Sequence, residues 1–237
     1  MSCSREPLPS VSVIVPTLRE VLNLPPLLRR IAEVRAGHDL DLDVWVMDDD
    51  SRDGSADAVA QLELSWVQFV ARSHDHGLAR AALDGMRRAR RDVVLIMDAD
   101  LSHPPEAIVA MLRELQRGAR AVIGSRYIEG GSTDAQWGWA RWINSRIATL
   151  LARPLTDLAD PMAGLFAMWR RDLDGAELDP VGYKIVLELI VKCGLSDVHE
   201  IPIHFVERRL GASKLTLRQQ LLYLAHLRRL YAFRLRR

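Results

Sequence analysis

The sequence predicts an α/β protein whose mostly parallel sheet is flanked by helices, and three observations support this prediction. Short aliphatic and β-branched runs alternate with segments in which apolar residues recur every three or four positions. The runs are continuously apolar, which is typical of strands covered on both faces. With 237 residues, 49% of them hydrophobic and 27% charged, the chain is long enough to bury such a core.

In the first half of the chain the two patterns alternate in a regular order. The predicted strands are 11–15, 44–47, 66–70, 93–97 and 121–123. The predicted helices between them are 27–34, 56–62, 78–89 and 107–115. Successive strand, helix and strand form βαβ units, so we expect these strands to lie parallel in one twisted sheet.

The second half is less regular. A strand is predicted at 165–169, a helix at 183–193 and a further strand at 198–206. The chain then closes with apolar residues three or four positions apart, a spacing that predicts an amphipathic helix. These residues are Leu217, Leu221, Leu224, Leu227 and Tyr231.

Charge is distributed unevenly along the chain. From Arg208 onward there are nine basic and no acidic residues, which leaves 23 basic and 31 acidic residues before that point. A basic amphipathic helix after an acidic body indicates attraction to an anionic membrane surface, and the alternative is a solvated helix face. We do not expect nucleic acid as a partner, because no recognised binding motif accompanies the charge.

Cysteine content and hydropathy indicate the compartment. Cys3 and Cys193 are far apart in sequence and lack neighbours at metal-ligand spacing, so neither a disulfide framework nor a zinc site is indicated. The sequence contains no apolar stretch of about 18 to 20 residues, the length needed to span a bilayer. We therefore expect a cytoplasmic protein that is peripheral on the cytoplasmic face of a membrane.

Polar clusters follow three of the predicted strands. Asp48 to Asp50, Asp98 to Asp100, and Ser125 with Arg126 all come directly after apolar runs. In open parallel sheets, ligands bind at the carboxyl ends of the strands. These clusters should therefore converge on one cleft.

Asp98 and Asp100 are the best candidates for metal binding. Two carboxylates about 4 Å apart repel by roughly 4 kcal/mol at an effective dielectric constant near 20, and a divalent cation or a raised pKa relieves this repulsion. Mg²⁺ and Mn²⁺ suit such oxygen ligands and complete their coordination with water and substrate phosphates. The alternative is that Asp98 only ends a strand and Asp100 caps a helix.

Longer motifs around these carboxylates resemble one family. They are Pro16-Thr17-Leu18-Arg19-Glu20, Asp48 to Gly54 (DDDSRDG), Asp98 to Glu106 (DADLSHPPE), Ser125-Arg126-Tyr127 with Gly130-Gly131, Asp160 to Gly164 (DPMAG), Gly182-Tyr183-Lys184 with Glu188, and Arg208 with Gly211, Ser213 and Lys214. Together they span residues 11–215 in the family's order. The sequence is similar to the inverting glycosyltransferases of the GT-A fold, specifically the dolichyl-phosphate mannose synthase group.

The resemblance implies a fold and an activity. The fold would be GT-A, a Rossmann-like twisted sheet within a catalytic domain over 1–214, followed by a basic amphipathic helix over 215–237 at the membrane surface. The reaction would transfer mannose from GDP-mannose to a polyprenyl monophosphate with inversion, using Mg²⁺ or Mn²⁺. The alternative within this class is a UDP-sugar donor. A membrane partner subunit is a further possibility that the sequence leaves open.

On the donor side, the resemblance assigns residues by position. Pro16 and Glu20 would contact the nucleoside, and Asp48 would be the acid that binds the base or ribose. Nucleotide and metal would be held by Asp98, Ala99 and Asp100, with Ser102 as a further metal ligand where many relatives have Gln. Arg208 and Lys214 would bind the donor diphosphate. Arg19 replaces the usual Asn of the opening motif.

On the acceptor side, Arg126 would meet the transferred phosphates and Arg141 would hold the acceptor phosphate. With Asp100, these two arginines are the predicted catalytic residues. A phosphate monoester is largely dianionic at pH 7 and already nucleophilic, so alignment and charge stabilisation should matter more than a general base. For His74, His76 and His103 we therefore favour surface or packing roles.

Two other protein classes share part of the pattern. A phosphorylation receiver domain also has strand-end acids in an α/β sheet, but it is about half this length and leaves 125–237 unexplained. A membrane-recruitment module that uses only the basic tail is the second alternative, and loss of metal-dependent sugar-nucleotide binding would favour it.

Overall fold

The computed structural model describes residues 6–134, 139–182, 184–206 and 217–236, and within these the side chains of 139–145 and 217–219 are not described. A seven-stranded sheet forms the centre of the molecule, in the order β3-β2-β1-β4-β7-β5-β8. Its strands are β1 (Val11–Thr17), β2 (Leu42–Asp48), β3 (Val67–Ala71), β4 (Val93–Ile96), β5 (Ala121–Ser125), β7 (Phe166–Trp169) and β8 (Val198–Pro202). A small second sheet pairs β6 (Ser132–Thr133) with β9 (His204–Phe205).

The sheet is parallel except for one strand. β7 runs antiparallel to both of its neighbours, β4 and β5, whereas the remaining pairs are parallel. β4 and β5 therefore end at the same edge of the sheet, and the segment leading into β7 reaches that edge too. This confirms the predicted mostly parallel sheet, and β7 is the exception to its direction.

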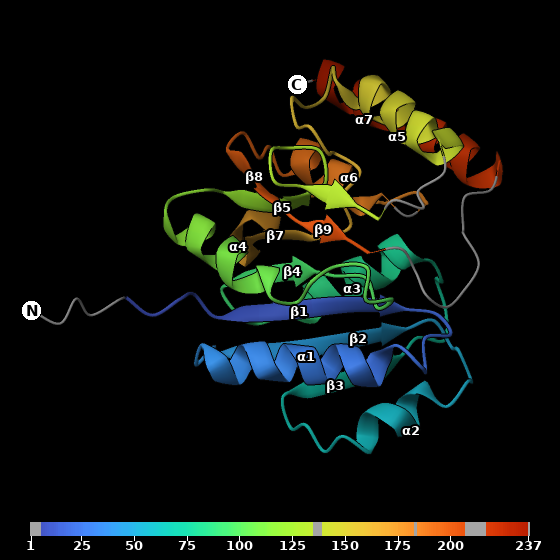
Figure 1. The fold of residues 1–237 in the computed structure, drawn as a ribbon. Coiled ribbons are helices and arrows are strands. Elements are labelled where there is room, and N and C mark those ends of the chain that lie inside the picture. The colour runs from blue at the N-terminus through green and yellow to red at the C-terminus, as the bar shows by residue number, and fades with distance from the viewer. Residues whose placement is uncertain (1–5, 135–138, 183, 207–216, 237) are drawn as a thin grey trace, which may run out of the picture.

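Helices cover both faces of the sheet (Figure 1). They are α1 (Leu24–Gly37), α2 (Ser55–Ala60), α3 (Leu78–Arg88), α4 (Ala107–Gln116), α5 (Trp139–Ala152), α6 (Ile185–Lys192) and α7 (Leu217–Leu235), with a short 3-10 helix at Arg170–Leu173. α1 and α4 pack on one face, where Leu28 and Leu112 join a core with Val13. α3 and α6 pack on the other, where Met86 and Leu189 join a core with Ile14.

The strand predicted at 198–206 is divided into two in the structure. Pro202 has no amide hydrogen to donate and ends β8, while Ile203 donates to the carbonyl of Ser125. The chain then continues as β9 in the second sheet, because the carbonyl of Ile203 accepts from Ser132. The prediction of one continuous strand was therefore wrong at Pro202.

A third, smaller core joins α7 to α5 and α6. It contains Tyr223, Leu227 and Leu230 from α7, together with Ala152 and Leu187 from the other two helices. The hydroxyl of Tyr223 donates to the carbonyl of Ala148 at 2.7 Å. The C-terminal helix predicted from the leucine spacing is confirmed, and it packs beside α5 at the top of Figure 1.

Within the described ranges, no helix is both long enough and apolar enough to cross a lipid bilayer.

Candidate active site

The sheet register brings the predicted site segments to one edge. Thr17 pairs with Asp48 at the carboxyl ends of β1 and β2, and the amide of Met97 bonds to the carbonyl of Ile14 just after β4. β7 enters from the same edge, with Phe166 opposite Ile96. The predicted convergence of the strand-end clusters is thus a direct result of strand order.

The loops after β1 and β2 are bonded to one another. The amide of Arg19 donates to Ser51 Oγ at 2.8 Å, and the amide of Val21 donates to Asp53 Oδ2 at 3.2 Å. Arg19 itself has a left-handed φ of 58°. These bonds join the Pro16–Glu20 segment to the 48–54 motif as one surface.

Two of the proposed nucleoside ligands already have protein partners. The buried carboxylate of Asp48 accepts from the amide of Ser51 at 2.8 Å and from its hydroxyl at 2.5 Å. Glu20 is half-buried and its Oε2 accepts from Asn23 Nδ2 at 2.6 Å. Their contacts with a nucleoside therefore stay predictions, as does that of the buried Pro16.

A buried ion pair beside this surface was missed by the sequence analysis. Arg72, which follows β3, pairs with Asp49, whose second oxygen accepts from the amide of Gly77 at 2.6 Å. Arg72 also donates to the carbonyl of Asp75 at 2.8 Å. Asp49 therefore holds the loop after β3 against the end of β2, and Asp48 and Asp49 have different structural roles.

The two metal-ligand candidates lie in different environments. The side chain of Asp98 is 40% exposed, whereas Asp100 is buried, with 6% of the whole residue exposed. Asp100 Oδ1 accepts from the amide of Ser102 at 3.1 Å and from its hydroxyl at 2.5 Å. Leu101 between them has a φ of 62°, an unusual conformation for a branched side chain. Asp100 and Ser102 thus form one tight turn, and Ala99 before it is buried.

This donor set fits a divalent cation only in part. Asp98 and Asp100 supply hard oxygen ligands, and the hydroxyl oxygen of Ser102 is the third candidate. In the part of the chain that the structure describes, no group of three or more His, Cys, Asp or Glu side chains could enclose a metal ion. Further ligands would have to come from water or from a bound phosphate, as is usual for Mg²⁺.

His103 lies next to Asp98. Its ring is 2% exposed and contacts Phe205 edge-on at 5.3 Å between centroids. Burial lowers the pKa of His103, against the opposing effects of Asp98 and Asp100. The predicted packing role is consistent with this burial, but Nδ1 lies only 3.7 Å from Asp98 Oδ2.

Arg126 is fixed by a bidentate ion pair that the sequence analysis did not predict. Its Nε and Nη2 donate to the two oxygens of Asp160 at 2.7 and 2.8 Å, and its amide also donates to Asp160. Burial alone would lower the pKa of Arg126, but the hydrogen bonds and charge of Asp160 outweigh it and raise the pKa. Glu200 in turn accepts from the amide of Asp160 at 3.1 Å.

Aromatic rings flank the same guanidinium. Arg126 lies over the rings of Tyr127 at 5.1 Å and Phe205 at 5.3 Å. Arg146 of α5 stacks on Tyr127 at 4.7 Å, so α5 lies next to the arginine site. Arg141 is in the first turn of α5, and its side chain is outside the described residues.

Arg208 and Lys214 belong to residues 207–216, which are outside the described residues, as is the predicted domain boundary at 214. Val206 precedes that segment, and its amide donates to the carbonyl of Ser102 at 3.1 Å. The last described residue before the 207–216 segment is therefore bonded to the turn that carries the candidate metal ligands.

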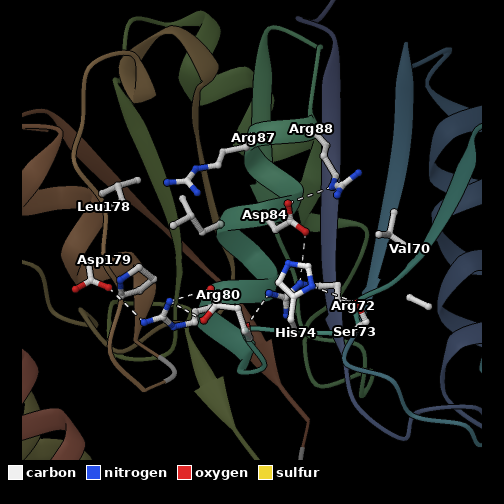
Figure 2. A pocket seen from close by; sticks show the side chains of 14 residues that line it. Val70, Arg72, Ser73, His74, Arg80, Asp84, Arg87, Arg88, Leu178 and Asp179 are labelled. Carbon is white, nitrogen blue, oxygen red and sulfur yellow. Dashed lines mark hydrogen bonds and ion pairs between the residues drawn. The ribbon is translucent and has the colours of Figure 1, made fainter.

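A polar depression of about 320 Å³ lies elsewhere, over the outer side of α3 between the end of β3 and the loop at 178–180 (Figure 2). Most of the arginines that line it form ion pairs with aspartates. Arg80 pairs with Asp75 at 2.8 Å, and Arg88 pairs with Asp84 at 3.2 Å. The lining includes none of the sequence-predicted site residues, so this depression is separate from the candidate active site.

Comparisons with known proteins identify the family of this chain. Residues 12–175 match Glycosyl transferase family 2. The chain is 40% identical to a dolichol-phosphate mannosyltransferase of Mycosarcoma maydis, over 95% of this chain and 80% of that protein. It is 35% identical to a polyprenol monophosphomannose synthase of Mycolicibacterium smegmatis, over 86% of this chain and 80% of the relative.

A third relative is longer than this chain. The dolichol-phosphate mannosyltransferase of Pyrococcus furiosus is 37% identical over 93% of this chain, which spans 63% of that protein.

Solved structures share the fold at low identity. Glucosyl-3-phosphoglycerate synthase of Mycobacterium tuberculosis, in complex with phosphoglyceric acid, superposes with a TM-score of 0.72 at 17% identity, covering 94% of this chain and 80% of that one. The same protein in complex with Mn²⁺, uridine diphosphate and glucosyl-3-phosphoglycerate gives 0.68 at 18% identity, covering 94% and 78%.

The likeness to these structures shows the GT-A-type fold alone. The sequence relatives and the family match show more, and they exclude the receiver-domain alternative. The chain therefore belongs to glycosyl transferase family 2 and, within it, to the group of dolichol-phosphate and polyprenol-phosphate mannosyltransferases.

Proposed function

We propose that this glycosyltransferase transfers mannose from GDP-mannose to a polyprenyl monophosphate, with inversion, at a membrane surface. The observation that carries the proposal is the meeting of the Asp98–Ser102 turn and the Asp160-bound Arg126 at one sheet edge. This arrangement offers oxygen ligands for a cation and, close by, an arginine held in a fixed plane. The names of the relatives supply the sugar and the lipid class.

On the donor side, Asp98, Asp100 and Ser102 would hold Mg²⁺ or Mn²⁺ together with the donor diphosphate. When bound, the cation would neutralise charge that develops on the departing nucleoside diphosphate. The Ser102 bonds fix the carboxylate of Asp100 within the turn, so this ligand needs little reorganisation. Arg208 and Lys214 are proposed to bind the same diphosphate, and Pro16, Glu20 and Asp48 the nucleoside.

On the acceptor side, Arg126 and Arg141 would align the lipid phosphate behind the anomeric carbon. The phosphate is a sufficient nucleophile at pH 7, so the arginines need to orient it without removing a proton. Asp160 compensates part of the charge on Arg126 and fixes its guanidinium plane, which suits planar recognition of a phosphate. One direct displacement then inverts the sugar.

The membrane surface would be approached by the outer sides of α5 and α7. Exposed apolar side chains project from both helices, although these helices also share a buried core. They are Ile147, Leu150 and Leu151 on α5 and Leu221, Leu224 and Leu235 on α7. Exposed apolar groups next to arginines are typical of helices that lie in a membrane interface. We propose that the docked membrane is a cytoplasmic face.

The reaction can be tested with the purified chain, a short polyprenyl phosphate, and labelled GDP-mannose or UDP-glucose. We expect polyprenyl phosphate mannose and GDP to form from GDP-mannose, with the β-anomer identified by NMR. Chelation with EDTA should stop turnover, and Mg²⁺ or Mn²⁺ should restore it. Transfer from UDP-glucose without any from GDP-mannose would contradict the proposed donor and favour the UDP-sugar alternative.

A further inference from the structure

His103 is a buried polar group to which the proposed reaction gives no task. Its side chain is 2% exposed, and Nδ1 has no hydrogen-bond partner within the described residues. An unsatisfied buried polar atom costs on the order of 1 to 3 kcal/mol, which an aliphatic side chain at this position would avoid. The chain therefore keeps an imidazole where packing alone would favour a hydrocarbon.

The acceptor that faces this nitrogen is a candidate metal ligand. Asp98 Oδ2 lies 3.7 Å from Nδ1, which is too far for a hydrogen bond. A shift of less than about one ångström would bring the two atoms to hydrogen-bond distance. The side chain of Asp98 is 40% exposed, so its carboxylate has room to move, whereas the His103 ring is enclosed. A small rotation of Asp98 would complete the bond.

Gly164 makes this close approach possible. A Cβ atom at this position would lie 2.8 Å from Asp98 Oδ2 and 2.8 Å from His103 Cε1, both inside van der Waals contact. Gly164 reaches this point because β7 is antiparallel to β4, and the pairing of Phe166 with Ile96 places it opposite Asp98. The absence of a side chain at 164 therefore keeps the carboxylate and the imidazole adjacent.

We propose that His103 is a positioning residue that donates a hydrogen bond from Nδ1 to Asp98 when Asp98 holds the divalent cation, in space provided by Gly164. The bond would restrict Asp98 to one rotamer, and the carboxylate would select the ring tautomer that carries its hydrogen on Nδ1. Partners of this kind tune metal affinity by about 10- to 100-fold. The inference rests on the proposed metal-dependent function.

The test compares His103→Leu with His103→Asn. Leucine has a similar volume and no polar atom, whereas the asparagine amide can place a donor near the position of Nδ1. The dissociation constant of Mn²⁺ is measured by electron paramagnetic resonance in the presence of GDP, and the melting temperature by circular dichroism.

We expect His103→Leu to weaken Mn²⁺ binding by about 10- to 100-fold while the melting temperature stays the same or rises. His103→Asn should restore most of the affinity. A purely structural histidine predicts the opposite pattern, a lower melting temperature with unchanged metal binding. Wild-type affinity in a folded His103→Leu protein, or an asparagine variant as weak as leucine, would overturn the inference.

The same experiment separates this inference from the proposed function. If the wild-type protein binds no Mn²⁺ with GDP, the metal-dependent function fails and the positioning role fails with it. If wild type and both variants bind Mn²⁺ equally, only the role of His103 is lost.

Discussion

Asp98 and Asp100 are two residues apart, yet their side chains should respond differently to substitution. Repulsion between the carboxylates would predict that removal of either one relieves strain. The structure shows instead that Asp100 accepts two bonds from Ser102 within a turn where Leu101 has a left-handed φ. Asp98 is more exposed, and the imidazole of His103 lies 3.7 Å from its carboxylate.

Asp98→Asn should therefore separate activity from stability. We expect metal-dependent turnover to fall by at least about 100-fold, because a bound cation contributes several kcal/mol of charge stabilisation. The free energy of unfolding should change by less than about 0.5 kcal/mol. Turnover in Mg²⁺ and Mn²⁺ and urea denaturation measure the two effects, and near-normal turnover would show that Asp98 is not a ligand.

Asp100→Ala should affect both properties. It removes the acceptor of the two Ser102 bonds, so a loss of about 1 to 3 kcal/mol in unfolding free energy should accompany the loss of turnover. Asp100→Asn is the matched control, because its carbonyl oxygen can keep the acceptor. If alanine and asparagine unfold at the same urea concentration, the turn bonds do not contribute to stability.

At the scale of single residues, the sequence predicted site residues that lie close to one another along the chain. Asp98 and Asp100 were identified because two acids follow an apolar run. Asp160 was not predicted as the partner of Arg126, because 34 residues separate them and an ion pair leaves no periodic signal. Gly164 is similar, since its role depends on a contact that only the register of β7 creates.

At the scale of elements, α7 shows why apolar spacing can mislead. The predicted stripe combined residues that the structure places on opposite sides, because Leu221 and Leu224 are 60% and 50% exposed whereas Leu227 is 3% exposed. The buried side is formed by Tyr223, Leu227 and Leu230. The prediction of one stripe was wrong, because α7 is apolar on two sides and the helix it packs against, α5, had not been assigned.

A buried carboxylate helps to hold α7 in place. Glu188 of α6 lies 3.0 Å from His226 Nε2 and 2.7 Å from Lys192 Nζ, and it accepts from the amide of Asp179 at 2.7 Å. Burial alone would raise the pKa of Glu188, but these hydrogen bonds outweigh it and lower the pKa below its ordinary value. The folded state therefore favours the ionised carboxylate.

The stability that Glu188 contributes should depend on pH in a defined direction. A folded pKa below the unfolded value of about 4.3 gives stability that is fully present above that pH and is lost as pH falls through the folded pKa. We expect Glu188→Gln to lower the free energy of unfolding by about 1 to 3 kcal/mol at pH 7. The difference from wild type should shrink below about pH 4.

Urea denaturation at several pH values measures this effect. The matched control is Glu33→Gln, on the exposed side of α1, which should follow the wild-type profile. A Glu188→Gln deficit that stays constant from pH 7 to below pH 4 would contradict a contribution from ionisation.

At the scale of the whole molecule, the sequence predicted the layered α/β architecture because continuous apolar strands and helical spacing alternate. It could not predict the direction of β7, since a strand that is buried on both faces has the same pattern in either direction. The sequence also did not show which arginines of the basic C-terminal segment bind to the rest of the protein. Arg229 pairs with Asp179 at 2.9 Å and Arg234 donates to the carbonyl of Leu155, so both are bound to the body.

Membrane docking should therefore depend on a smaller set of residues than the basic tail as a whole. On a helix with 3.6 residues per turn, Leu221, Leu224 and Arg228 lie within an arc of about 60° on the exposed side of α7. We expect Arg228→Gln with Arg236→Gln to weaken binding to anionic liposomes by about 30-fold, since each arginine contributes about 1 kcal/mol. Leu221→Gln with Leu224→Gln should weaken binding as well.

Co-sedimentation with liposomes of increasing anionic lipid content tests this docking, and added salt should reduce it. The matched control is Arg87→Gln with Arg90→Gln, two exposed arginines at and just after the end of α3. If this control weakens binding as much as the α7 variants, net charge rather than a specific surface controls the association. Unchanged binding of folded α7 variants would favour a solvated helix.

Because β7 is antiparallel to its neighbours, the length of the segment that leads into it matters. The five residues from Asp160 to Gly164 contact Arg126 at one end and the Asp98 carboxylate at the other. Lys184 Nζ donates to the carbonyl of Met162 between them at 2.9 Å. This short segment fixes the spacing between its two contacts. Adding or removing one residue within it would displace Arg126 relative to the carboxylate of Asp98. Length changes before Ala159 or beyond β7 would leave their separation intact.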